Sequence, residues 1–164
     1  MGRDVLQRIK SLKNEIMALN FNSKGYLHET IALTYEDFVQ HFGTTQYRME
    51  QIQNSIPYFQ IFHSCGCEIV YVDGSFVSKK KKPEDIDICF DITGIKEEKI
   101  LRDFPKFLDI NERGRIRREL KCHIFTFTQE DTELFDILNT DRYHNPKGLV
   151  ILDLKELKEI HAQK

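Results

Sequence analysis

Two aspartates that could bind a metal follow a pair of residues that could bind phosphate. Asp85 and Asp87 come ten and twelve residues after Gly74-Ser75. Side chains two residues apart on a strand point the same way, so both carboxylates are expected on one face. Converging carboxylates hold a hard divalent cation, Mg²⁺ or Mn²⁺, together with substrate phosphates. A glycine after a strand lets backbone amides approach a ligand, and with the Ser75 hydroxyl they can cradle phosphate oxygens. The spacing therefore predicts a joint metal and phosphate site.

The same segments resemble the nucleotidyltransferase superfamily, which is marked by Gly-Ser after one strand and Asp-x-Asp on the next. The residues that carry the resemblance are Tyr71-Val72-Asp73-Gly74-Ser75-Phe76-Val77 and Pro83-Glu84-Asp85-Ile86-Asp87. They are most similar to a group of small bacterial nucleotidyltransferase-like proteins. The similarity covers about residues 21–155, with further matches at Gly25-Tyr26-Leu27-His28, Phe42, Arg48, Thr140-Asp141-Arg142 and Pro146-Lys147-Gly148.

The resemblance implies a role for each of these residues. Gly74 and Ser75 would bind a nucleoside triphosphate, and Asp85 and Asp87 would hold Mg²⁺ as metal-binding and catalytic residues. A nucleoside monophosphate would then pass to a hydroxyl of a protein or RNA acceptor. The resemblance also implies a place in a bacterial toxin–antitoxin or phage-defence system.

A third carboxylate, which active members of the superfamily take from a neighbouring strand, is not found at the expected place. The strand over residues 121–125 offers His123 there instead. A neutral imidazole can act as a base or bind a softer metal, but it brings no negative charge to Mg²⁺. Asp91 lies roughly 13 Å beyond Asp87 at about 3.3 Å per residue, too far for the same ion. Asp73 is better placed if the two strands pair. Loss of the third carboxylate would weaken deprotonation of an acceptor hydroxyl, whereas Mg²⁺ and a nucleotide could still bind.

Two basic clusters could contact phosphate. Lys79 to Lys82 lie between the glycine turn and the aspartates, so Lys79 and Lys80 are candidate phosphate-binding residues, with a solvated loop as the alternative. The second cluster is expected on an exposed helix face, although an RNA backbone could use it. It comprises Arg113, Arg115, Arg117 and Arg118.

The cysteines and one histidine raise the question of zinc. His63, Cys65 and Cys67 have a spacing that could ligate a metal, but the fourth ligand would have to be a remote Cys89, Cys122 or His123. Buried thiols at the end of a helix are the preferred interpretation. Four cysteines in a chain of this size do not form a disulfide scaffold, and reduced thiols are expected.

The N-terminus is predicted to be an amphipathic helix. Its apolar residues recur at steps of four and three, as Val5, Ile9, Leu12, Ile16 and Leu19. We expect this helix to pack on its own domain, with a dimer or partner-protein contact as the alternative. Residues 1–20 are therefore treated as a helix apart from a nucleotidyltransferase-like domain over residues 21–164.

The remaining pattern predicts a mixed α/β fold with a small central sheet flanked by helices. Helices are expected from Thr34 to a stop at Gly43, from about Thr45 towards Phe62 with a kink or restart at Pro57, twice within 97–120, and at 131–138. The two helices within 97–120 should be interrupted by Pro105 and by a turn at residues 111–114. Strands are expected at 68–72, 86–90, 122–127 and 148–154, before a charged final helix.

Composition limits the classes of function. The formal net charge of −2 provides no global positive field for nucleic acid or a membrane surface. The chain has neither a signal-peptide pattern nor eighteen consecutive apolar residues, so we expect a cytoplasmic protein with no membrane partner. Two functions remain as alternatives to transfer. One is a catalytically degenerate fold that acts as a nucleotide-binding or protein-interaction module; the other is an RNA-binding protein.

Overall fold

A computed structural model describes residues 19–156, which form a five-stranded mixed sheet. Of the predicted N-terminal helix over residues 1–20, residues 1–18 lie outside the described part of the chain, and Leu19 and Asn20 are not helical. The charged final helix falls in residues 157–164, which also lie outside it. The strand order is β1-β5-β2-β3-β4. The bounds are β1 Ile31–Leu33, β2 Ile69–Asp73, β3 Ile86–Asp91, β4 Cys122–Phe127 and β5 Val150–Asp153. The predicted mixed α/β class is confirmed.

The register of the three strands at one side of the sheet decides which side chains meet. β2 and β3 pair antiparallel, with Asp73 opposite Asp87. β3 and β4 pair parallel, with Asp87 opposite His123. Directly opposed residues lie on the same face of a sheet, so these three side chains share one face. The pairing on which the prediction for Asp73 depended is therefore present.

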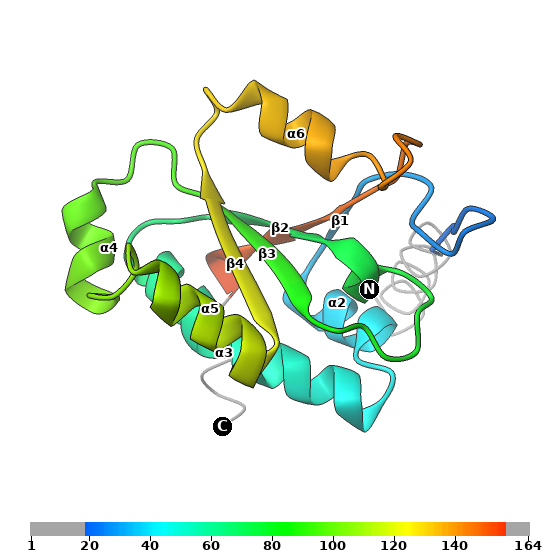
Figure 1. Cartoon of the computed structure of the whole chain (residues 1–164), viewed down its shortest axis with the longest axis horizontal. Coiled ribbons are helices and arrows are strands. Elements are labelled where there is room, and N and C mark those ends of the chain that lie inside the picture. The colour runs from blue at the N-terminus through cyan, green and yellow to red at the C-terminus, as the bar shows by residue number, and fades with distance from the viewer. Residues whose placement is uncertain (1–18, 157–164) are drawn as a thin grey trace, which may run out of the picture.

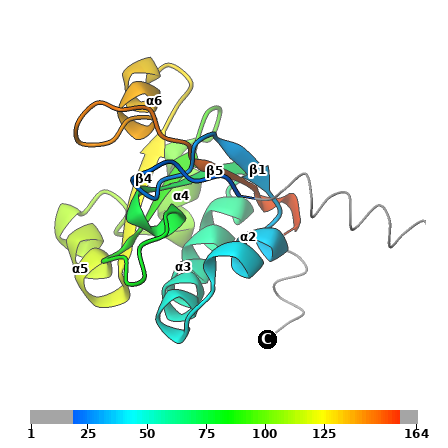
Figure 2. The same cartoon turned by 90° about the vertical axis from the view of Figure 1, so that its right-hand side faces the viewer.

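Helices cover the two faces unequally (Figures 1 and 2). The main core lies between the sheet and helices α2 to α5, and the smaller core lies under α6 on the opposite face. The bounds are α2 Tyr35–Phe42, α3 Gln46–Ser64, α4 Glu97–Asp103, α5 Ile110–Leu120 and α6 Thr132–Leu138, with short 3₁₀ turns η1 Gly74–Val77 and η2 Leu154–Glu156. Over residues 19–156 none of the helices has the length and apolar character needed to span a membrane.

Capping residues set the beginnings of α2 and α3. The side chains of Thr34 and Thr45 accept hydrogen bonds from backbone amides three residues on, which satisfies a free helix donor. Gly43 follows α2, as predicted. α3 runs without interruption through Pro57, so the restart allowed there does not occur. Its residues Ile52 and Phe59 are fully buried in the main core.

One expectation about the other elements was wrong, and one strand was missed. Residues 111–114 do not form a turn, because Asp109 caps the Asn111 amide and α5 continues through Gly114. The interruption lies only between Phe104 and Asp109, where Pro105 disfavours a helical conformation at the residue before it. Strand β1 was not predicted, since three residues give too short a pattern to recognise.

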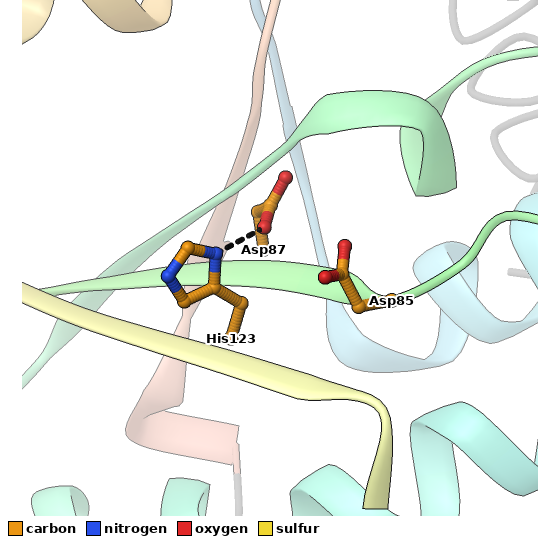
Figure 3. A group of neighbouring side chains, drawn as sticks. All are labelled: Asp85, Asp87 and His123. Carbon is orange, nitrogen blue, oxygen red and sulfur yellow. Dashed lines mark hydrogen bonds and ion pairs between the residues drawn. The ribbon is translucent and has the colours of Figure 1, made fainter. Parts of the chain in front are cut away.

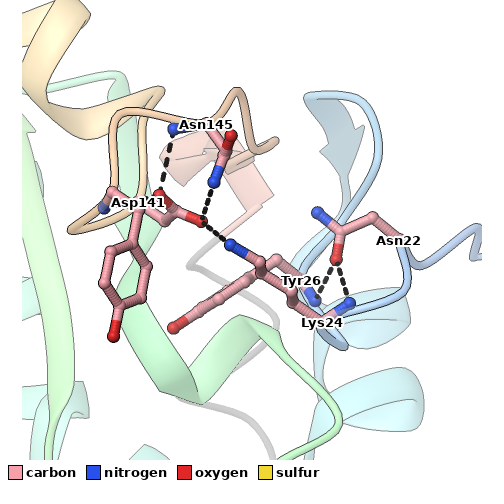
Figure 4. Close-up of polar contacts among 6 residues, drawn as sticks. Asn22, Lys24, Tyr26, Asp141 and Asn145 are labelled. Carbon is pink, nitrogen blue, oxygen red and sulfur yellow. Dashed lines mark hydrogen bonds and ion pairs between the residues drawn. The ribbon is translucent and has the colours of Figure 1, made fainter.

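The two ends of the described region lie side by side (Figure 4). The Asp141 carboxylate accepts hydrogen bonds from the amides of Tyr143 and Asn145. It also forms an ion pair with Lys24 at 3.4 Å. The Gly148 amide donates to the Leu27 carbonyl at 2.7 Å. The amino-terminal and closing motifs of the sequence therefore form one surface beside the sheet.

Candidate functional site

Asp85, Asp87 and His123 converge on the face of the sheet that also carries α6 (Figure 3). One ligand atom from each of the three lies within 4.8 Å of the others, and all three side chains are half-buried. Asp87 Oδ1 is 3.0 Å from His123 Nδ1. Asp87 lies on β3 and Asp85 directly precedes that strand. Their ligand atoms approach each other, so the predicted convergence of the two carboxylates is present. This is the candidate site.

Gly74 makes room for Asp87. It begins η1 directly after β2 with φ +76°, in the left-handed region that favours glycine. A Cβ at this position would coincide with Asp87 Oδ2. The predicted glycine turn therefore contacts the predicted metal strand. The neighbouring Ser75 hydroxyl makes no hydrogen bond to any residue that the structure describes, and it is available to a ligand.

Asp73 shares the face of Asp87, but another residue holds its carboxylate. Asp73 and Lys147 form an ion pair in which the side chains retain only 11% and 8% exposure. Burial raises the pKa of the Asp73 carboxyl, and the ammonium group of Lys147 opposes that rise. Lys147 belongs to the closing motif Pro146-Lys147-Gly148, yet the sequence alone did not indicate this role. Asp73 is thus adjacent to the cluster and committed to a buried pair.

Arg117 on α5 contacts the cluster from the other side. Its Nε lies 2.8 Å from Asp85 Oδ2, and its side chain is half exposed. The sequence placed Arg117 among arginines of an exposed helix face. Its neighbour Arg115 instead forms ion pairs with Glu112 and Glu119 on the same helix. Two arginines of this cluster are therefore paired with carboxylates, which weakens the RNA-binding alternative.

Asp91 lies at the far end of β3 and does not join the cluster. It is opposite Phe127 in β4, and its carboxylate accepts hydrogen bonds from the amide and the hydroxyl of Thr93. The distance argument made from the sequence is consistent with this position. The third ligand position in the candidate site is filled by His123.

The loop between η1 and β3 is fixed by a buried arginine. Arg48 on α3 is 4% exposed and donates to the carbonyls of Phe42 (3.3 Å), Phe76 (2.6 Å), Ser78 (3.0 Å) and Lys80. Burial lowers the pKa of its guanidinium. Within residues 19–156, Lys79 and Lys80 form no ion pair with Asp85 or Asp87. The Lys79 ammonium group instead lies over the ring of Phe21, 5.4 Å from the ring centroid.

The cysteines are free thiols and are all buried. Cys65 Sγ contacts the Lys99 carbonyl at 3.3 Å, and Cys67 Sγ contacts the Asp91 carbonyl at 3.2 Å. Burial raises the pKa values of Cys67, Cys89 and Cys122 to about 12. Protonated, buried thiols are poor zinc ligands, and the one group with metal-ligand geometry in the described chain is Asp85, Asp87 and His123.

The donor set of the cluster decides which ion it fits. Two carboxylates are the oxygen ligands that Mg²⁺ and Mn²⁺ prefer, whereas an imidazole also suits transition metals. If His123 Nδ1 carries the proton, it donates to Asp87 and leaves Nε2 as an acceptor. The cluster can therefore hold a divalent cation through Asp85 and Asp87, and it has a base beside that cation.

One protein-family model matches the chain, a family of unknown function (DUF6932), over residues 19–153. No curated protein matches the sequence, and no solved structure matches the fold. The matched range contains the whole sheet, the glycine turn and the Asp85–Asp87–His123 cluster.

Proposed function

We propose a divalent-cation-dependent nucleotidyl transfer for this chain, which belongs to that family of unknown function. A nucleoside monophosphate would pass from a nucleoside triphosphate to a hydroxyl of a protein or RNA acceptor, with pyrophosphate as the leaving group and the hydroxyl proton going to His123. The observation that carries the proposal is the convergence of Asp85 and Asp87 against Gly74, with His123 beside them. The resemblance of the Gly-Ser turn and the Asp-x-Asp strand to the nucleotidyltransferase superfamily supports it.

Each residue of the cluster has a separate task in this proposal. Asp85 and Asp87 hold Mg²⁺ or Mn²⁺, which supplies positive charge for the phosphates. Gly74 and Ser75 offer a backbone amide and a hydroxyl to phosphate oxygens. His123, with Nδ1 directed at Asp87, accepts the proton of the acceptor hydroxyl at Nε2. The imidazole thus takes over proton removal in the absence of a free third carboxylate.

The test is transfer of label from each α-³²P nucleoside triphosphate, with Mg²⁺ or Mn²⁺, to the protein itself, to total RNA and to total cell protein. We expect Asp85→Asn and Asp87→Asn to abolish labelling. Asp91→Asn is the matched control, since Asp91 shares the strand and the face, but among the described residues its carboxylate accepts hydrogen bonds only from Thr93. Wild-type labelling that survives both substitutions at the cluster would contradict the proposal.

A second candidate is a nucleotide-binding module without turnover. It is favoured by the buried pair of Asp73 and Lys147, because this pair withholds the nearest further carboxylate from the site. Calorimetry with Mg-ATP and Mg-GTP separates the two candidates. Heat of binding without label transfer would favour the module, whereas a folded protein that gives no heat at millimolar ligand would contradict both.

A further inference from the structure

A cavity lies beside the lysine loop, which is formed by Lys79 to Lys82 between η1 and β3, and it is separate from the Asp85–Asp87–His123 cluster. Its volume is about 360 Å³. It lies between three segments: the start of the described chain at Leu19 and Phe21, the junction of α2 and α3, and the loop after η1. The residues that line it include neither Gly74 nor Asp85 nor Asp87. The cavity is thus a separate place at which a ligand could bind.

Every charged residue among the described ones that line the cavity is basic. Lys79, Lys80 and Lys81 line it together with His41 and the buried Arg48, and no aspartate or glutamate does. None of the three lysines forms an ion pair with any residue in 19–156. The three lysines thus form a local positive cluster in a chain whose net charge is −2. Like charges held close together without a counter-ion repel one another. An anionic ligand would remove that repulsion.

The wall that carries the lysines is fixed rather than loosely attached. Arg48 donates to the carbonyls of Phe76, Ser78 and Lys80, and the Lys79 amide donates to the Gly25 carbonyl at 2.9 Å. The loop is therefore held from two sides. A fixed backbone reduces the entropy lost when a ligand binds.

The rest of the lining limits the class of anion. Thr44 and Thr45 contribute hydroxyl groups, while Leu19 and Phe21 contribute apolar surface and the buried Phe42 lies behind them. Ligand pockets usually measure about 300–1,000 Å³ and combine apolar walls with a few polar groups. The cavity is therefore at the small end of this range. It matches one phosphate group joined to a compact apolar or aromatic group.

We propose that this cavity binds a small phosphate ester, with the phosphate at Lys79–Lys81 and the ring or apolar group against Leu19 and Phe21. The cavity needs no divalent cation, because lysines replace it as the source of positive charge. The lysine loop thus serves an anion other than the phosphates that the Asp85–Asp87–His123 cluster would hold. This inference does not depend on nucleotidyl transfer.

The experiment is a titration of the full chain, ¹⁵N-labelled, with phenyl phosphate in EDTA and low salt. Phenol and inorganic phosphate serve as comparison ligands. We expect amide shifts at Thr44, Thr45 and residues 78–81, and phenyl phosphate binding at least about three-fold tighter than inorganic phosphate, because an apolar ring is also buried. Absence of binding, or shifts centred on Gly74 and Asp87, would overturn the proposal.

Matched variants separate the cavity from general charge effects. Lys80→Gln with Lys81→Gln should weaken phenyl phosphate binding at least about five-fold, because two charge-assisted contacts are lost. Lys99→Gln with Lys106→Gln changes the net charge equally at exposed positions elsewhere and should have little effect. Asp87→Asn should leave the affinity unchanged. Equal weakening in both lysine pairs would overturn the proposal, as would a short RNA that binds more than ten-fold tighter with a steep dependence on salt.

Discussion

The carboxylate of Asp87 occupies the space that a side chain on Gly74 would need. Gly74 begins η1 directly after β2, with φ +76°, while Asp87 lies on β3 opposite Asp73. The glycine turn and the metal strand are therefore packed against each other at one point. Any residue larger than glycine at position 74 must displace the carboxylate that the candidate site depends on.

We predict that Gly74→Ala both destabilises the protein and weakens cation binding. An alanine there would be strained by its positive φ and would collide with Asp87, at a combined cost of about 2 kcal/mol or more. The measurements are urea unfolding and Mn²⁺ calorimetry. Gly94→Ala is the control, since Gly94 has the same φ of +76° but has no atom within 4 Å of an added Cβ. It should cost about 1 kcal/mol and keep the cation affinity; equal loss of affinity in both variants would contradict the prediction.

Local patterns were sufficient for the parts of the fold that depend on neighbours in sequence. The helix starts at Thr34 and near Thr45, and the strand pattern that places Asp85 and Asp87 on one side, follow from side-chain chemistry and the two-residue period of a strand. The position of His123 followed from the resemblance. These features need no knowledge of tertiary contacts.

The ion pairs of the candidate site could not be predicted in this way. Arg117 and Asp85 are separated by 32 residues, and Lys147 and Asp73 by 74. No periodicity connects such partners, because sheet register and helix packing bring them together. The path of the lysine loop likewise depends on Arg48, which bonds to its carbonyls. Arg48 is buried, whereas a charged residue on a helix is usually expected at the surface.

We predict that Arg48 holds the lysine loop in place and is essential to stability. Arg48→Met would leave the carbonyls of Phe42, Phe76 and Ser78 without a donor, which should cost about 3 kcal/mol or more. Arg48→Lys keeps the charge but cannot reach all these carbonyls, so its loss should be intermediate. Urea unfolding measures both. Arg118→Met, on the exposed face of α5, is the control, and a loss no greater at Arg48 than at Arg118 would contradict the role.

We predict that the buried thiols make the protein labile at alkaline pH. Burial raises the pKa values of Cys67, Cys89 and Cys122 from 9.0 to about 12. Above pH 9 the unfolded chain therefore loses thiol protons that the folded chain keeps, and stability falls as pH rises towards 12. The loss approaches about 1.4 kcal/mol per thiol and pH unit. Urea unfolding between pH 8 and 11 measures it; Cys89→Ala should show a shallower decline than the wild type, and an unchanged decline would contradict the assignment.

We predict that Arg117 competes with a cation for Asp85. Its guanidinium lies 2.8 Å from Asp85 Oδ2, so a bound divalent ion must share or displace this contact. Arg117→Ala should therefore tighten Mn²⁺ binding by about two- to five-fold, the range for a pair exposed on one side. Calorimetry at constant ionic strength measures the affinity. Arg118→Ala is the matched control, because it removes the same charge from the next position of α5 and forms no ion pair with the described residues. Equal tightening in both variants would mean that only net charge matters, and no change in Arg117→Ala would mean that the cation does not meet Asp85.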